Sequence, residues 1–149
     1  MITYQTESWE QYWRDAEPLW QQHWQEIALD QDAIKLDPDK EAYAKLYDMG
    51  KLLLVTAREN GALLGYHASF IMAHLHYKST MIGHSDVFWL HPDYRKGYVG
   101  IRLLHKVEDE MRARGVKKIS ISHKLHLDLG TLFRHLGYKH IENTYAKML

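Results

Sequence analysis

The feature that most constrains this chain is a strand that runs directly into a basic, glycine-containing loop and then into a helix. An apolar strand is expected from about Thr80 to Leu90, and the segment HPDYRKGYVG, residues 91–100, follows it. Such a loop presents free backbone N–H groups and the positive end of the helix dipole, and its glycines allow an anion to approach the backbone closely. The segment therefore predicts a phosphate site, to which Arg95 and Lys96 add charge. The alternative is an ordinary strand-to-helix connection with basic surface residues.

The loop differs from two familiar phosphate-binding motifs. No Gly-Lys-Ser or Gly-Lys-Thr ends it, so it is not a Walker A loop, and the G-x-G-x-x-G spacing of dinucleotide-binding folds is missing. The loop therefore predicts neither nucleotide hydrolysis nor the binding of a dinucleotide cofactor.

Hydropathy periodicity predicts one α+β (three-layer α/β) domain over residues 1–149, with a mixed sheet of about seven strands and about four helices. The expected strands are Ile2–Thr6, Lys51–Arg58, Ala62–His76, Thr80–Leu90, Val116–His123, Tyr138–Ile141 and Thr144–Met148. The expected helices begin at Trp9 after the N-cap Ser8, and span Lys40 to about Met49, Ile101 to about Arg114, and Leu127–Leu136. Pro18 falls inside the first helical pattern and is expected to kink or split it.

Charge is balanced over the whole chain but not along it. Lys and Arg total 19, as do Asp and Glu, which excludes the bulk basic character of a protein that coats nucleic acid. Residues 1–50 hold eleven acids and four bases, a net charge of −7, whereas residues 91–149 hold six acids and twelve bases, a net charge of +6. This division is consistent with two ligands of opposite charge, or simply with solvated helix faces.

The chain has no cysteine, which excludes a disulfide scaffold, a cysteine-ligated metal and a cysteine nucleophile. The histidine pairs His74/His76 and His123/His126 lack further ligands at convincing spacing, so no metal site is expected. The N-terminus does not resemble a secretory signal, and the apolar runs are too short to span a membrane, so a cytoplasmic protein is expected.

Two segments resemble the GNAT superfamily of N-acetyltransferases. LHPDYRKGYVGIRLL, residues 90–104, resembles its acetyl-CoA signature, and LFRHLGY, residues 132–138, resembles its Leu-Tyr-x-x-Leu-Gly-Phe segment. The order of elements fits the family over essentially the whole chain. The resemblance implies a mostly antiparallel sheet, acetyl-CoA as co-substrate, and an amine-bearing small molecule or protein as acceptor. It implies no membrane partner and leaves a homodimer open, and the acidic first half disfavours nucleic acid.

The resemblance also assigns residues to the cofactor. The backbone of Phe88, Trp89 and Leu90 would pair with the pantetheine arm, and Phe133 would pack against the cofactor. The residues assigned to the pyrophosphate are Arg95, Lys96, Gly97, Tyr98, Val99 and Gly100.

The sequence departs from the family pattern at two positions. Tyr98 stands where members usually have glycine, while Gly97 lies one residue earlier, so the phosphate cradle is expected to be reshaped or to use Gly97 instead. Phe133 stands where many members have a tyrosine that protonates the departing thiolate, and phenylalanine cannot do so.

Direct transfer to an amine needs a proton acceptor, because an amine with a pKa of about 10 is mostly protonated at neutral pH. In the family the base often lies on the fourth strand, where His84 and Asp86 are the candidates. Spacing of two places both on one face of the strand. The ordinary pKa of histidine suits a base, and Asp86 could orient it, bind a cationic acceptor or act through a water. Alternatively, both are simply polar residues of the strand.

The first half of the chain leaves several functions open. Its acidic, tryptophan-rich helices would wall the acceptor site in this family, and carboxylates and tryptophan rings attract a protonated amine, although core packing also explains the rings. The alternatives to an N-acetyltransferase are transfer of a longer acyl group, a catalytically weak CoA-binding or protein-binding module, and an inhibitor or adaptor that binds through the acidic helices.

Overall fold

The computed structural model describes all 149 residues and contains one five-stranded sheet in the order β1-β2-β3-β4-β5. The strands are β1 (Ile2–Thr6), β2 (Leu52–Glu59), β3 (Ala62–His74), β4 (Tyr77–Leu90) and β5 (Lys118–Ser120). The helices are α1 (Trp9–Ile27), α2 (Lys40–Asp48), α3 (Val99–Ala113) and α4 (Gly130–His135), with a short 3-10 helix η1 (Pro92–Tyr94). Neighbouring strands are antiparallel except for β4 and β5, which are parallel, so the sheet is mixed and mostly antiparallel as expected.

Local sequence signals explain where several elements begin and end. Ser8 caps α1, because its hydroxyl accepts a hydrogen bond from the Gln11 N–H at 3.2 Å, and Asp39 caps α2 in the same way. Asn60 and Gly61 turn β2 back into β3 with φ angles of 51° and 84°, the left-handed pair that a two-residue hairpin requires.

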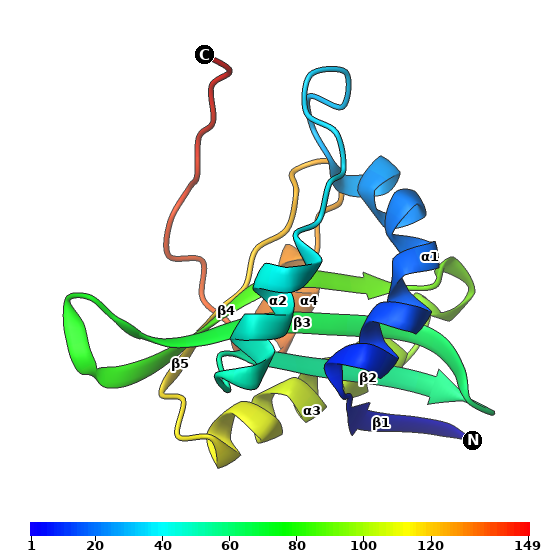
Figure 1. Cartoon of the computed structure of the whole chain (residues 1–149), viewed down its shortest axis with the longest axis horizontal. Coiled ribbons are helices and arrows are strands. Elements are labelled where there is room, and N and C mark those ends of the chain that lie inside the picture. The colour runs from blue at the N-terminus through cyan, green and yellow to red at the C-terminus, as the bar shows by residue number, and fades with distance from the viewer.

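Helices α1 and α2 lie on one face of the sheet and α3 on the other (Figure 1), and a hydrophobic core lies between the sheet and the helices on each face. In β2, Leu52 and Leu54 pack toward α1, whereas Leu53 and Val55 pack toward α3. The period of two thus buries both faces of the strand, as expected of the continuous apolar run in the sequence. None of the helices is both long and apolar enough to cross a membrane.

The expectation of seven strands is wrong by two. Residues 138–149 form no strand, are exposed from Lys139 onward, and lead away from the sheet (Figure 1). The expected strand Val116–His123 is reduced to three residues, because only Lys118–Ser120 pair with β4. A strand pattern becomes a strand only where a neighbouring backbone supplies hydrogen bonds, and the C-terminal segment meets none.

Pro18 does not split α1, although splitting was one of the two outcomes that the sequence predicted for it. The helix continues from Trp9 to Ile27 with Pro18 on its exposed side. Pro18 has no N–H for the carbonyl of Arg14, but Arg14 is also exposed, so water can satisfy that oxygen. The first helix is therefore long enough to extend to the end of β4.

A buried ion pair joins the N-terminal segment to the sheet. Arg58 contacts Glu7 at 2.6 Å and Asp15 at 2.7 Å, and its Nη1 donates to the Gly61 carbonyl at 2.9 Å. The Thr56 hydroxyl also donates to Glu7, at 2.6 Å. Glu7 and Arg58 are both buried, so their charges depend on each other.

We expect Arg58→Ala to lower the free energy of unfolding by about 3–5 kcal/mol, because Glu7 would remain buried without a counter-charge. Urea denaturation measures the change. Arg112→Ala is the control, since Arg112 pairs with Glu108 and Asp109 on the surface and should cost less than about 1 kcal/mol. Equal effects of the two substitutions would contradict the prediction.

Candidate active site

The sheet opens where β4 separates from β5. The two strands pair only from Ile82 to His84 on β4, opposite Lys118 to Ser120 on β5. Beyond His84, the β4 residues Ser85–Leu90 have β3 on one side and no strand on the other. This free edge contains Phe88, Trp89 and Leu90, the three residues that the sequence assigned to a pantetheine arm. An unpaired strand edge can take up an extended ligand through its backbone.

The loop after β4 presents a run of free backbone donors. No hydrogen bond within the protein occupies the N–H groups of the six residues Lys96–Ile101, and the first bond of α3 comes from Arg102 to the Tyr98 carbonyl. No side chain caps α3, and Gly97 adopts a φ of 115°, a conformation that side chains rarely allow. Successive free N–H groups at the start of a helix are the components of an anion site.

The side chains of the loop differ in their exposure, because Arg95 contacts the rest of the protein whereas Lys96 and Tyr98 face solvent. Arg95 is turned back into the protein, where its Nε donates to the Leu90 carbonyl at 2.8 Å and its Nη2 pairs with Glu26 of α1 at 2.6 Å. Lys96 is exposed, and the Tyr98 ring is 73% exposed. Tyr98 therefore leaves the backbone donors uncovered although it occupies the family's usual glycine position.

Asp86 is the extra residue of a β-bulge in β4. The register pairs Ser69 with Ser85 and Ala68 with Val87, so Asp86 has no partner on β3. A bulge places two consecutive residues on one face, here Asp86 and Val87, and the Asp86 carboxylate accepts a hydrogen bond from the Tyr43 hydroxyl of α2 at 2.7 Å. Although Asp86 is exposed on one side, the groups packed around it raise its pKa by desolvation, and the Tyr43 hydrogen bond opposes part of that rise.

His84 lies on the same side of the sheet as Asp86 but in a different position. It is opposite Phe70, which stacks on Tyr43, and it also neighbours Ser120 of β5. The spacing of two thus places both candidates toward α2. Only Asp86 lines the cavity described next, so the structure does not bring the two side chains together in it.

A cavity of about 130 Å³ lies between α1, α2 and the bulge. It is lined mostly by aromatic and aliphatic side chains, namely Trp9, Tyr12, Trp20, His23, Trp24, Ile27, Leu36, Pro38, Tyr43, Asp86 and Val87. His23 is buried, and its Nδ1 lies 2.9 Å from the Tyr66 hydroxyl. Burial lowers the pKa of His23 to about 4, which keeps the ring neutral at pH 7. Asp86 is therefore the one charged group in the lining.

Sequence reasoning missed Tyr43 and His23. Tyr43 falls within the second expected helix, but helical spacing does not reveal that its hydroxyl reaches a strand 43 residues away. Three of the tryptophans that could face a site do so, Trp9, Trp20 and Trp24, whereas Trp13 packs in the core.

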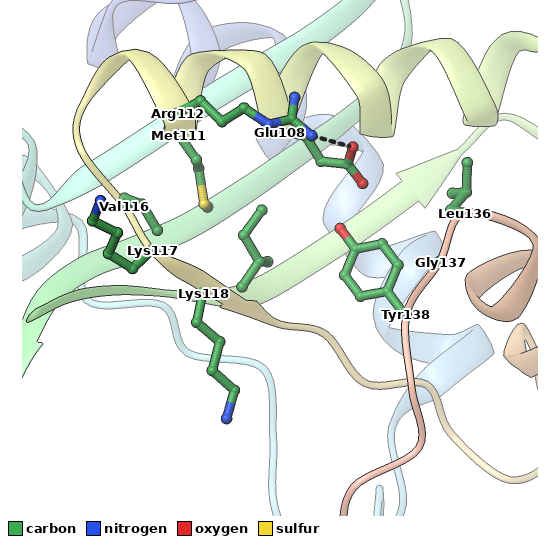
Figure 2. Close-up of a pocket in the computed structure, with 10 residues that line it drawn as sticks. Glu108, Met111, Arg112, Val116, Lys117, Lys118, Leu136, Gly137 and Tyr138 are labelled. Atoms are coloured by element: carbon green, nitrogen blue, oxygen red, sulfur yellow. Dashed lines mark hydrogen bonds and ion pairs between the residues drawn. The ribbon is translucent and has the colours of Figure 1, made fainter.

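Phe133 is buried in α4, between the rings of His123 at 5.8 Å and Tyr138 at 5.9 Å. Burial raises the pKa of the Tyr138 hydroxyl well above its usual range, with the Glu108 carboxylate adding to the shift. Tyr138 also borders a second, surface pocket of about 250 Å³ beside β5 and the end of α3 (Figure 2). That pocket contains none of the predicted site residues.

The sequence profile of the acetyltransferase (GNAT) family matches residues 6–138. This chain belongs to the GNAT family. The segment of residues 90–104, which resembles the family's signature, contains the end of β4, the loop and the start of α3. No curated protein sequence matches the chain.

Solved GNAT structures share the fold over nearly the whole chain. One is a predicted acetyltransferase with acetyl-CoA from Clostridium acetobutylicum, with 15% identity, a TM-score of 0.74, and coverage of 99% of this chain and 96% of that one. Another is a ribosomal-protein-alanine N-acetyltransferase from Brucella melitensis, with 16% identity, a TM-score of 0.72, and coverage of 100% and 99%. A glucosamine-6-phosphate N-acetyltransferase from Arabidopsis thaliana has 11% identity, a TM-score of 0.73, and coverage of 99% and 98%.

We expect Tyr43→Phe to raise the pKa of Asp86 further, because the substitution removes a hydrogen bond that favours the ionised carboxylate. Phenylalanine keeps the stacking of this ring on Trp9 and Phe70. Carbon-detected NMR titration of the Asp86 carboxyl measures the shift. Tyr47→Phe, one helical turn further along α2, is the control because its hydroxyl donates to the Glu7 carbonyl instead. An unchanged titration in Tyr43→Phe would contradict the hydrogen bond.

Proposed function

We propose that this GNAT protein is an acetyl-CoA-dependent N-acetyltransferase that transfers the acetyl group directly to a primary amine in a ternary complex. The observation that carries the proposal is the run of six free N–H groups, Lys96–Ile101, beside the free edge of β4. A pyrophosphate needs the first feature, and an amide-containing pantetheine arm needs the second. The two occur side by side, as one extended cofactor requires.

The proposed cofactor contacts follow from these positions. Backbone N–H groups of Lys96, Gly97, Tyr98, Val99 and Gly100 bind the pyrophosphate, and Lys96 adds a positive charge. Arg95 contributes by holding the loop against Leu90 and Glu26, since its own backbone N–H donates to the Pro92 carbonyl at 3.2 Å. The backbone of Phe88, Trp89 and Leu90 pairs with the pantetheine arm, and Phe133 supports the cofactor from α4.

Asp86 is the proposed base. When bound, acetyl-CoA supplies a thioester carbonyl carbon that an uncharged amine can attack. A carboxylate with a raised pKa is a better proton acceptor than an ordinary surface aspartate, and this one lines the cavity. His84, two residues earlier on the same face, is the second candidate. Phe133 cannot protonate the thiolate, so that proton comes from another group or from water.

A catalytically weak CoA-binding module is the second candidate function. Phe133 favours it, because the ring is buried and carries no hydroxyl at the position of the family's usual acid. Such a module would bind acetyl-CoA equally well but would release no CoA in the presence of amines.

We expect acetyl-CoA and CoA, but not ATP or NAD, to raise the melting temperature of the protein, because a ligand of the native state stabilises it. Gly97→Ala should weaken CoA binding about ten-fold, since alanine is strained at a φ of 115°. Gly115→Ala is the matched control, because Gly115 also has a positive φ, 75°, with open space around an added Cβ, but it follows α3 and lies outside the loop. Calorimetric titration with CoA measures both variants. The absence of a selective CoA effect would refute the proposed function.

We expect Asp86→Asn to lower kcat/KM for acetyl transfer by about 10²-fold or more while CoA binding is kept, because general-base catalysis typically contributes that much. Thiol release from acetyl-CoA with a panel of primary amines measures turnover. His84→Ala is assayed in parallel. Loss of turnover in His84→Ala alone would move the base to His84, and unchanged rates in both variants would reject both residues.

A further inference from the structure

The cavity at the bulge combines one carboxylate with a wall of aromatic rings. Asp86 lies at one side, held by Tyr43, and the other walls come from α1 and from the segment before α2. We propose that this cavity selects small primary monoamines with a compact, apolar body, such as a single ring or a short branched alkyl group. The inference rests on the proposed acetyl transfer and names the class of acceptor for the same site.

The volume of the cavity limits the size of the apolar group that an amine bound there can carry. Its volume of about 130 Å³ is close to that of an engineered apolar cavity of about 150 Å³ that binds benzene. A ring-sized group therefore fits, whereas a disaccharide does not fit within it.

The charges of the residues that line the cavity favour an acceptor with a single positive group. Asp86 is its one carboxylate, the buried His23 ring is neutral, and neither lysine nor arginine is present. The nearest basic loop residue, Arg95, is already paired with Glu26 at 2.6 Å. A phosphate on the acceptor would find no cation here, and a second ammonium group would lie among rings without a counter-charge. The net charge of −7 over residues 1–50 also attracts a cation to this side of the molecule.

The aromatic rings of the lining can contact both the ammonium group and the apolar group of such an amine. Trp9 stacks on Tyr43 with ring centroids 5.8 Å apart, so an aromatic face lies beside the hydroxyl that holds Asp86. Aromatic faces attract ammonium groups, and they also pack against an apolar body. Because Ile27, Leu36, Pro38 and Val87 complete the lining, a hydroxyl-rich acceptor would lose hydrogen bonds with water and regain few.

The transfer balances as follows. The ammonium gives one proton to the Asp86 carboxylate, and the uncharged nitrogen attacks the thioester carbonyl carbon. A C–N bond forms and the C–S bond breaks, so the products are the N-acetyl amine, CoA thiol and one proton released to solvent. No oxidant or reductant is needed.

The experiment compares three amine acceptors that differ in charge and polarity. Benzylamine is assayed against 1,4-bis(aminomethyl)benzene, which adds a second ammonium group, and against glucosamine 6-phosphate, which adds hydroxyls and a phosphate. We expect kcat/KM for benzylamine to be at least ten-fold higher than for either. Quenching of tryptophan fluorescence by benzylamine in the presence of CoA, where no transfer can occur, measures binding alone. Benzyl alcohol, which lacks the charge, should bind at least ten-fold more weakly.

A cavity-filling variant tests the location. Leu36→Trp should reduce benzylamine binding and turnover at least ten-fold while calorimetry shows unchanged CoA binding. Leu29→Trp is the matched control, because Leu29 is exposed and lies outside the lining. Normal benzylamine use by Leu36→Trp, or equal use of the diamine or the sugar phosphate, would overturn the inference and leave the acetyltransferase proposal intact. Benzylamine binding without transfer of acetyl to any amine would refute the acetyltransferase proposal and, with it, the assignment of these amines as acceptors.

Discussion

The arrangement of the site depends on one extra residue in β4. The bulge at Asp86 places two consecutive residues, Asp86 and Val87, on the face that carries α1 and α2, and the pairing of β4 with β5 ends just before it, at His84 and Ser120. Bulges bend strands and increase their twist, so the same residue accounts for both the composition of the cavity wall and the opening of the sheet edge. In a regular strand, Asp86 would still share the α2 face with His84, but Val87 and Trp89 would alternate to the α3 side.

A buried polar network supports the bulge from the opposite side of the sheet. The His67 ring is fully buried, with Nδ1 2.9 Å from the Ser69 hydroxyl and Nε2 3.0 Å from the Ser85 hydroxyl. Ser69 and Ser85 are the first residues that pair before the bulge, so His67 bridges the two strands at that point. Burial lowers the pKa of His67 to about 3, and the ring can therefore both donate and accept as a neutral group. Both ring nitrogens are satisfied, as a buried polar group requires.

Sequence patterns predicted the parts of the molecule that local chemistry determines. The N-cap Ser8, the helix that begins at Lys40 and the loop that follows Leu90 each depend on neighbouring residues, and the sequence predicted their positions correctly. Contacts between distant segments were not predictable in this way. The register that creates the bulge, the Tyr43 hydrogen bond and the failure of residues 138–149 to find a strand partner all depend on backbone positions in three dimensions. The spacing of His84 and Asp86 predicted a shared face but not that only one of them reaches the cavity.

The acidic first part and the basic last part of the chain are joined by an ion pair. Glu26, at the end of the acidic helix α1, pairs with Arg95 of the basic loop, and the Glu26 carbonyl also lies 2.7 Å from His126. His23, Trp24 and Ile27, within one turn of Glu26, line the aromatic cavity. Arg95 in turn holds the Leu90 carbonyl at the end of β4. One arginine thus connects the helix that walls the cavity with the loop that carries the free N–H groups. The Arg95–Glu26 ion pair would therefore transmit a displacement of that loop to α1, which walls the cavity.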